Sequence, residues 1–573
     1  MNESKFLKLH KNEFIVYGYE SEGRHIIPPH FQPKRFYGDT LLWILPKNAD
    51  EGFSQKITCD KYKIVKTVNF IKIYLYGEIS TEKYPSRPLC DFFGMRFSFE
   101  IDSGEMLQKA FARFYWDNQL NQIAERTFIR KKKDIREGYV LSTLNEKAYA
   151  GTYPAVDHEF HMKGCFAIGG KAEAELTKRM LELQLKIMRE DKKGFSRNVC
   201  AVQPNRIREY NVWRSSRNRK KRAQMFRITA NIEFIEGLYN YYSLTKDMEF
   251  IKRNITAAEK NCDYIESFIT PEYLLNSHVY YEDQVIKDGP VLQAQLFAVN
   301  SFRLMAEIEN LLGREKERIH YINLSEKLGT AAVKSYPYGF WDNDKKRFID
   351  WIDKDGNSHD HIHLLANELP EMFNLCTQEQ ALHCRKIIEA HTEVFEKFPS
   401  FVAAKIEDYT DSEIGSGGPY DLCAAGRYWC WDAEYAAFRK DGEKLRKQLE
   451  QIAVQAEKDG YFMGERYDMN YVYYNTGKDS QHNWHGASLY YEYPNVFQYV
   501  LICKYIGVRR GFNCDIEIEP MFSKGKVILE TYGIEFEAED KKLKSVTNLT
   551  SEPITVGYKN QIITLSASDK ILF

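Results

Sequence analysis

The chain has 573 residues, which is more than one compact hydrophobic core accommodates, so we expect two or three domains. Its 80 basic and 81 acidic residues give a formal charge of −1, and this balance argues against a role for the whole chain in binding nucleic acid. The N-terminus lacks the apolar segment of a secretory signal, no uncharged apolar run approaches the ~18 residues of a membrane span, and the 11 cysteines are scattered, so we expect a cytoplasmic protein that binds no membrane.

Residues 1–103 are predicted to form β structure, because aromatic and β-branched runs such as 70–76 are separated by Gly, Pro and Asp. From about residue 104 the apolar residues recur with helical spacing, as in the stripe of Leu181, Leu185 and Met188. The predicted helices are 104–128, 168–190, 222–244, 248–269, 289–312, 315–335, 363–374, 377–397, 422–440, 442–458 and 485–507. Residues 509–573 return to β-type runs.

About eleven helices in antiparallel pairs predict an (α/α)6 toroid, with one helix unassigned. A stack of helical repeats is the alternative, but no internal period of that kind is visible. We therefore predict an N-terminal β-rich domain (1–103), a helical catalytic domain (104–508) and a small C-terminal β domain (509–573). The long connections, rich in aromatic and polar residues, are expected to gather at one end of the toroid. They are 129–167, 191–221, 336–362, 398–421 and 459–484.

Glu282 is the first candidate catalytic residue. It lies on a predicted loop between two helices, directly after Tyr280 and Tyr281. Packing against these rings is expected to desolvate the carboxyl group and raise its pKa, as a general acid at neutral pH requires. A solvated loop acid beside a helix cap is the alternative interpretation.

Glu465 is the second candidate. It follows the run Gly460–Gly464, which offers few polar partners, and Arg466 comes directly after it. A neighbouring guanidinium keeps a glutamate ionised, which suits a base; a surface ion pair is the alternative. A protonated acid and an ionised carboxylate on loops walled by rings are the groups that glycosidic bond cleavage needs.

Four segments resemble the glucoamylase family of inverting glycoside hydrolases, within the six-hairpin glycosidase superfamily. Two of them surround the candidate acids. The turn 262–265 (Cys-Asp-Tyr-Ile) precedes the acid loop 281–283 (Tyr-Glu-Asp). The segment 460–466 is similar to the family's base loop, with Gly464 in place of a proline and Arg466 in place of a glutamine.

The other two segments carry binding residues. Asp157 matches the aspartate of the family's sugar-gripping Arg-Asp pair, but Val156 replaces the arginine, and the segment 426–429 is similar to a Gly-x-x-Trp helix start. The resemblance implies an (α/α)6 barrel, inversion with a water nucleophile, Glu282 as acid, Glu465 as base and Asp157 as a sugar ligand.

Further side chains near these segments are predicted to contact the sugar. They are Tyr153, Tyr281, Asp283, Trp213, Trp341, Asp360, His361, Trp429, Arg466, Trp484 and His485. The run of His359, His361 and His363 could converge on a strand, yet it lacks a companion zinc motif, so we expect no metal. The basic run 214–222 is expected to be a solvated surface or a contact for an anionic sugar group.

The sequence thus predicts an inverting hydrolase of O-glycosyl bonds that acts on a short oligosaccharide or glycoside and needs no cofactor. A glycoside phosphorylase on the same scaffold is an alternative, which the presence of Glu465 argues against. An epimerase or unsaturated-uronyl hydrolase and a non-catalytic glycan-binding protein also stay open, as do the sugar, the linkage and assembly into a homo-oligomer.

Overall fold

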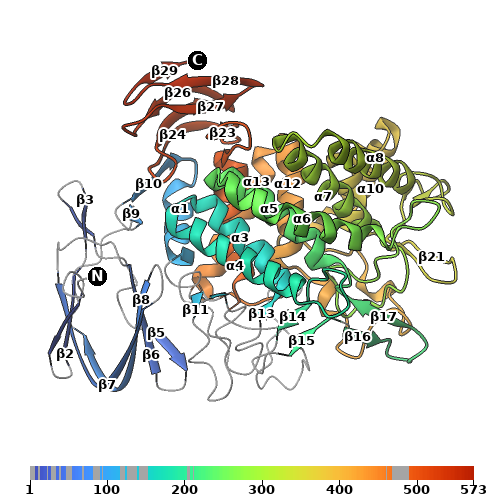
Figure 1. The fold of residues 1–573 in the computed structure, drawn as a ribbon, viewed down its shortest axis with the longest axis horizontal. Helices are drawn as coiled ribbons and strands as arrows, with labels where there is room; N and C mark the ends of the chain where they lie inside the picture. The colour runs from blue at the N-terminus through green and yellow to red at the C-terminus, as the bar shows by residue number, and fades with distance from the viewer. Residues whose placement is uncertain are drawn as a thin grey trace.

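The computed structural model describes residues 95–573 apart from 116–122, 125–138, 141–152, 203–206, 211, 460, 462 and 468–489, and of residues 1–94 it describes the strands alone. Helices occupy most of the central part, and strands form both ends of the chain (Figure 1). Among the described residues, no helix combines the length and the apolar character needed to cross a lipid bilayer.

The central helices form two layers. They are α1 (Gly104–Arg113), α3 (Ala155–Ile168), α4 (Lys171–Arg189), α5 (Thr229–Thr245), α6 (Met248–Glu266), α7 (Leu292–Leu311), α8 (Glu315–Ala332), α9 (Leu364–Met372), α10 (Gln378–Glu389), α11 (Thr392–Phe395), α12 (Gly426–Phe438), α13 (Gly442–Lys458) and α14 (Glu492–Tyr499), which a π-helical stretch Val500–Ile506 continues. One layer contains α3, α5, α7, α9, α12 and α14, which contact one another in this order, and α14 contacts α3 in turn. We call it the cyclic layer. The other layer packs against it, with α4, α6, α8, α10 and α13 each beside the helix that precedes it in the chain.

Each predicted helical range overlaps a helix of the structure, and the helix without a prediction is α3. Its described residues, 157–168, are all buried, and they include Asp157, His158, Glu159, His161 and Lys163. A helix that is enclosed on every side and holds buried polar groups has no apolar stripe against a polar face, so the usual periodicity is missing.

Strands at the two ends of the chain confirm the predicted β regions. A six-stranded sheet has the order β1-β2-β7-β8-β6-β5, and a short hairpin pairs β3 with β4. These strands are β1 (Leu7–His10), β2 (Glu13–Tyr17), β3 (Tyr19–Ser21), β4 (Arg24–Ile26), β5 (Lys34–Tyr37), β6 (Thr40–Pro46), β7 (Ser54–Lys66) and β8 (Phe70–Thr81).

The C-terminal strands form a four-stranded sheet, β22-β23-β27-β28, and a six-stranded sheet, β29-β26-β25-β24-β10-β9. They are β22 (Val508–Arg510), β23 (Ile516–Ile518), β24 (Lys524–Leu529), β25 (Ile534–Glu539), β26 (Lys542–Asn548), β27 (Ile554–Tyr558), β28 (Gln561–Leu565) and β29 (Lys570–Leu572), joined by β9 (Asp91–Phe92) and β10 (Met95–Ile101). Phe97 pairs with Leu529 in this register. The division at residues 103 and 509 stays a prediction, to which the structure adds that β9 and β10 pair with the C-terminal strands.

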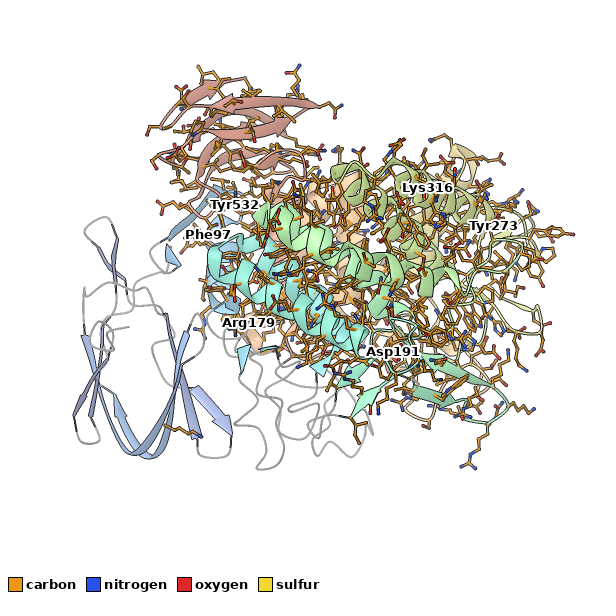
Figure 2. All side chains as sticks on the ribbon, in the orientation of Figure 1. Phe97, Arg179, Asp191, Tyr273, Lys316 and Tyr532 are labelled. Atoms are coloured by element: carbon orange, nitrogen blue, oxygen red, sulfur yellow. The ribbon has the colours of Figure 1, made fainter. Side chains whose placement is uncertain are left out.

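Well-defined contacts join the C-terminal sheet to the helices. The Tyr532 hydroxyl lies 3.0 Å from the carbonyl oxygens of Phe166 and Ala167, at the end of α3, and donates to them. It thereby satisfies helix-terminal carbonyls that have no partner within the helix. Phe97 of β10, a strand of this sheet, packs against Phe111 of α1 with ring centroids 5.2 Å apart. Figure 2 shows Phe97 and Tyr532 at this junction.

Short strands lie on the side of the helices away from the C-terminal sheets (Figure 1). They are β13 (Tyr153–Pro154), β14 (Ala201–Val202), β15 (Arg208–Glu209), β16 (Val212–Ser215), β17 (Arg222–Met225), β18 (Trp341–Asp342), β19 (Arg347–Phe348), β20 (Trp351–Ile352) and β21 (Ser358–His359), while β11 (Ile123–Ala124) pairs with β12 (Tyr139–Val140). Because α3 follows β13, α5 follows β17 and α9 follows β21, these helices of the cyclic layer begin on this side.

Candidate active site

The first turns of α12 and α14 bring together a buried ion pair. The backbone N–H of Arg427 donates to Oε1 of Glu492 at 2.7 Å, and its guanidinium donates to Oε2 at 2.6 and 2.9 Å. Gly426 makes this approach possible, since a Cβ there would lie 2.9 Å from Cγ of Glu492. Burial and a bidentate contact fix the guanidinium in one orientation.

Glu465 lies beside this pair. Its Oε1 is 3.1 Å from Arg466 and 3.9 Å from Arg427, and the side chain is almost completely buried. Arg466 also contacts Oδ1 of Asp421 at 3.1 Å, so one guanidinium joins two carboxyl groups. Two positive charges facing a single oxygen favour the ionised form of Glu465, as the sequence predicts for a base.

Asp283 and Asp421 form a pair of carboxyl groups. Burial raises the pKa of Asp421 well above its ordinary value, and the charge and hydrogen bond of Asp283 add to this shift. The backbone N–H of Gln284 donates to Oδ2 of Asp421 at 2.7 Å, which holds the pair together. Two carboxyl groups in hydrogen-bond contact share a proton between them, and the raised pKa of Asp421 favours a pair that retains this proton. Asp283 is the more accessible member, with 18% of its side chain exposed and Arg214 at 3.6 Å.

Asp157, in the first turn of α3, completes this group, which we call the carboxylate cluster: Asp157, Asp283, Asp421, Glu465, Glu492, Arg427 and Arg466. The Tyr490 hydroxyl donates to Oδ1 of Asp157 at 3.2 Å. Burial raises the pKa of Asp157 to about 7, although the charge of Arg427 opposes the shift. The structure thus brings four predicted site residues together, namely Asp157, Asp283, Glu465 and Arg466.

Glu282 does not belong to the carboxylate cluster. It lies in an enclosed network of hydrogen bonds and ion pairs. Its Oε1 accepts a hydrogen bond from Nε2 of His363 at 2.9 Å, and Lys287 lies 3.4 Å from its Oε2. Nδ1 of His363 accepts the backbone N–H of Ala366 at 3.2 Å, which assigns the proton to Nε2. Lys287 also contacts Asp350 at 2.9 Å. The polar and charged side chains of this network are all fully buried.

This environment corrects the expectation for Glu282. Burial does act to raise its pKa, but the charge of Lys287 and the hydrogen bond from His363 are stronger, and the pKa falls to about 2. A carboxyl group with this pKa holds no proton at neutral pH and is a poor general acid. The sequence pattern identified the aromatic neighbours correctly and missed the lysine five residues further on.

Tyr281 lies next to Arg427 of the carboxylate cluster. Its hydroxyl donates to Oε2 of Glu159 at 2.6 Å and accepts a hydrogen bond from Nε1 of Trp431 at 3.2 Å. The guanidinium of Arg427 lies 5.9 Å from the centre of its ring. The ring is fully buried, so its contacts are with protein side chains.

Three predicted sugar contacts have packing or pairing roles instead. Trp429 is fully buried and donates to Gln448 of α13 at 3.2 Å, which favours a packing role over the predicted contact with the sugar. Trp341 is 6% exposed and packs edge-on against Phe348, which favours a packing role. Asp360 pairs with Lys345 and Arg347, on the hairpin formed by β18 and β19.

The other predictions are placed as follows. Trp213 is 39% exposed and lies edge-on to His278, with Arg222 over its ring. His361 stacks on Tyr409 with ring centroids 3.7 Å apart. Tyr153 belongs to β13, which pairs with β14. Trp484 and His485 lie outside the described residues.

The sequence did not predict Asp421, Arg427 or Glu492 as site residues. One signal was available for Glu492, because the tripeptide Tyr-Tyr-Glu occurs both at 280–282 and at 490–492. Asp421 and Arg427 have no comparable mark, since their roles depend on contacts across more than forty residues of chain, such as the one between Arg466 and Asp421.

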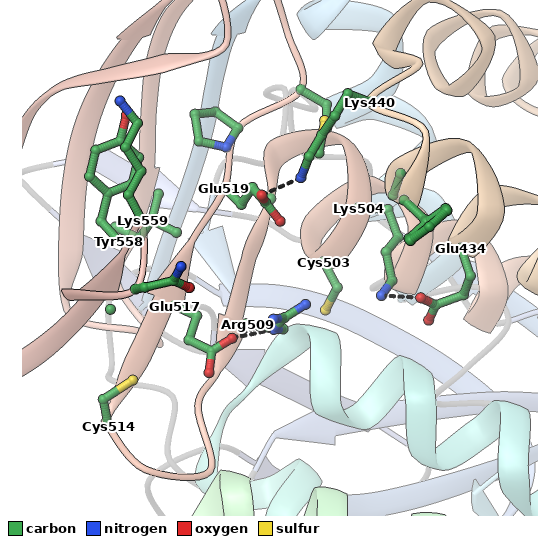
Figure 3. A pocket seen from close by; sticks show the side chains of 18 of the residues that line it. Glu434, Lys440, Cys503, Lys504, Arg509, Cys514, Glu517, Glu519, Tyr558 and Lys559 are labelled. Carbon is green, nitrogen blue, oxygen red and sulfur yellow. Dashed lines mark hydrogen bonds and ion pairs between the residues drawn. The ribbon is translucent and has the colours of Figure 1, made fainter. Parts of the chain in front are cut away.

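A wide cavity lies elsewhere in the molecule. It has a volume of about 1330 Å³ and extends between the far ends of α5, α7 and α12 and the C-terminal strands. Figure 3 shows the ion pairs on its wall, among them Lys504 with Glu434 at 2.6 Å and Arg509 with Glu517 at 2.6 Å. Among the described residues, no predicted site residue lines this cavity. The perturbed carboxyl groups, and not the volume, identify the candidate site.

No protein-family model and no curated protein sequence matches this chain. Solved structures do. A GH78 family rhamnosidase of Bacillus sp. GL1 is 15% identical, with a TM-score of 0.50 over 84% of this chain and 43% of that one. An α-L-rhamnosidase from Dictyoglumus thermophilum is 14% identical, with a TM-score of 0.52 over 88% and 52%. A structure titled sialidase is 11% identical, with a TM-score of 0.52 over 88% and 53%. The chain spans about half the length of these proteins and shares their fold.

Proposed function

We propose that this chain is an inverting glycoside hydrolase that cleaves a glycosidic bond of a short oligosaccharide or glycoside. The observation that carries the proposal is the position of Arg466, which joins Glu465 to Asp421. Glu465 is the ionised carboxylate that hydrolysis requires, and Asp421 belongs to the pair that supplies a proton.

The arrangement of the helices supports an (α/α)6 toroid. Six helices contact one another in a cycle, and α1, which contacts α13 and α14, adds a sixth member to the outer layer. Arg427 and Glu492 stand in the first turns of α12 and α14, and Asp157 in that of α3. The carboxylate cluster therefore belongs to the end of the toroid at which these helices begin and the long connections gather.

In this mechanism the acid is the Asp283–Asp421 pair, and not Glu282. Asp283 is the member that a substrate reaches, and it passes the shared proton to the glycosidic oxygen as the bond to the anomeric carbon breaks. This transfer leaves both carboxyl groups of the pair ionised; Arg214 lies 3.6 Å from Asp283, and Arg466 and the N–H of Gln284 stabilise the charge of Asp421. Glu282 instead holds Lys287 and His363 in place beneath this loop.

Glu465 acts as the base. It takes a proton from the water that attacks the anomeric carbon on the face opposite to the leaving oxygen, and this geometry inverts the configuration. Asp157 and Arg427 are available for hydrogen bonds to sugar hydroxyls, because both lie within the cluster and Arg427 fixes the position of Glu465.

The charge of the cluster favours hydrolysis over phosphorolysis. Among the described residues, three guanidinium groups, those of Arg214, Arg427 and Arg466, face the carboxyl groups of Asp157, Asp283, Asp421, Glu465 and Glu492. Even with one shared proton and Asp157 half protonated, the acids outnumber the cations, and a phosphate dianion is repelled. The same balance favours a neutral sugar over a uronic acid.

A screen of aryl glycosides and disaccharides, with product anomers followed by NMR, tests the proposal. We expect turnover of at least one neutral glycoside without added phosphate, and a product of inverted configuration. Turnover that requires inorganic phosphate would assign a phosphorylase, and retention of configuration would remove Glu465 from the role of base.

A further inference from the structure

Two histidines and one glutamate converge above the loop that carries Glu282. His359 ends β21, His361 follows it, and Glu413 comes from the segment between α11 and α12. Oε1 of Glu413 lies 2.6 Å from Nδ1 of His359 and 2.9 Å from Nε2 of His361. The ligand-capable atoms of the three side chains all lie within 4.8 Å of one another. His363 is not part of this group, because it faces Glu282.

Neighbouring side chains fix both imidazole rings. Trp351 stacks on His359 with ring centroids 4.2 Å apart and an interplanar angle of 5°. Tyr409 stacks on His361 at 3.7 Å and 16°. The three side chains are only slightly exposed, at 14%, 14% and 7%. The rings are therefore held before any ligand arrives, which lowers the entropy lost on binding.

The remaining polar atoms of the group have partners that suit a metal site. Oε2 of Glu413 accepts hydrogen bonds from the N–H and the hydroxyl of Thr410, at 2.7 and 2.8 Å, which leaves Oε1 to face the histidines. Nε2 of His359 lies 3.3 Å from Oδ2 of Asp353. Lys221 donates to the same oxygen at 2.7 Å and stabilises the charge of Asp353. A carboxylate behind a histidine is the usual outer partner of a metal-binding imidazole.

This partner decides what Nδ1 of His359 can do. When Nε2 donates its proton to Asp353, Nδ1 carries a lone pair and faces the oxygen of Glu413. Two lone pairs 2.6 Å apart repel each other unless a proton or a cation lies between them. Lys221 lies 3.1 Å from Nε2, and its donation there favours the opposite tautomer, with a proton between His359 and Glu413. A proton between His359 and Glu413 therefore satisfies this contact when no metal is bound, and a cation would take its place.

We infer that His359, His361 and Glu413 form a zinc site. Two imidazoles and a carboxylate are a common set of three protein ligands for Zn²⁺, with water in the fourth position. The nitrogen–oxygen distances of 2.6 and 2.9 Å need to widen to about 3.3 Å to hold the ion tetrahedrally at its usual bond lengths of ~2.0–2.2 Å. Because stacking holds the two rings, rotation of the Glu413 side chain supplies this movement.

A zinc ion at this position would join segments that surround the carboxylate cluster. The backbone N–H of Ile286 donates to the carbonyl oxygen of Glu413 at 2.7 Å, and that of Gly415 donates to Gln284 at 2.8 Å. The segment of Glu413 is thus hydrogen-bonded to the loop that carries Asp283. The ion has a structural role in this inference, which stands whether or not the chain hydrolyses glycosides.

The test is zinc binding by the full chain. After treatment with a chelator and gel filtration, the protein is titrated with Zn²⁺, and bound metal is measured by elemental analysis together with the melting temperature. We expect one zinc per chain and a higher melting temperature with zinc. His361→Gln and Glu413→Gln should each lower the affinity by at least ~10²-fold, and Asp353→Asn by about 10-fold, as outer partners usually do.

His320→Gln is the matched control, because His320 forms a single exposed pair with Glu266 at 3.2 Å. It should bind zinc as the wild type does. Circular dichroism checks that each variant is folded, and Glu413→Gln retains the shape of the side chain if His361→Gln fails. Absence of zinc binding in the wild type would overturn the inference, and so would equal binding by the wild type and both ligand variants.

Discussion

Glu282 and Glu465 have similar local sequences and different environments. Both stand on loops, after aromatic residues and ahead of a helix of the cyclic layer. Glu282 is enclosed by Lys287 and His363, and its pKa is lowered to about 2. Glu465 faces Arg466 and Arg427, whose guanidinium groups also contact other acids of the cluster. The comparison teaches that side chains from distant elements, and not the adjacent rings, determine what a carboxyl group can do.

The largest effect is expected when Glu465, the proposed base, is replaced. Glu465→Gln retains the shape of the side chain but cannot accept a proton from water, so kcat should fall by ~10³-fold. Steady-state kinetics on the glycoside found in the screen measures it. Glu457→Gln is the control, since Glu457 is an exposed residue of α13 paired with Lys109. Activity within tenfold of the wild type would show that Glu465 is not the base.

Glu282→Gln should act mainly on stability. It removes one partner of Lys287 inside a fully buried network, and breaking such a pair lowers the free energy of unfolding by about 3 kcal/mol or more. Urea unfolding at pH 7 measures this difference. An unchanged midpoint of unfolding would contradict the structural role.

The same substitution has a defined pH dependence. The pKa of Glu282 is about 2 in the folded protein and 4.5 ordinarily. Its ionised form therefore contributes stability above pH 4.5, and this contribution is lost as the pH falls from 4.5 towards 2. The gap between wild type and Glu282→Gln should narrow over that window. A gap that widens there would reverse the assigned sign.

Asp283→Asn sharpens the contrast, because it changes the next residue in the chain. It removes the accessible member of the proton-sharing pair, and kcat should fall by ~10²-fold. Stability should change little, since the asparagine amide can donate to Asp421 in place of the shared proton. Activity retained in Asp283→Asn but lost in a folded Glu282→Gln would return the role of acid to Glu282.

Much of this fold follows from the sequence, because most helices have one apolar stripe. The helix without a prediction, α3, is enclosed on every side and holds buried His158, His161 and Lys163, so period and polarity both mislead there. Of the site, the sequence located Glu465, Arg466, Asp157 and Asp283. The contacts of Asp421 and Glu492 depend on how distant helices meet, and no local pattern encodes them.

A stability effect of the opposite sign concerns Asp157, which is buried about as deeply as Glu282 but, among the described residues, has no ion pair like that of Glu282 with Lys287. Its pKa is about 7 in the fold and 3.8 ordinarily, so the folded chain keeps a proton that the unfolded chain releases. The stability that this bound proton contributes is therefore complete below pH 3.8, and it is lost as the pH rises to about 7. Asp157→Asn removes this loss and should stabilise the protein at pH 8, with no gain below pH 4. Thermal unfolding at the two pH values measures it, and a variant less stable than the wild type at pH 8 would mean that Arg427 holds Asp157 ionised, in the way Lys287 holds Glu282.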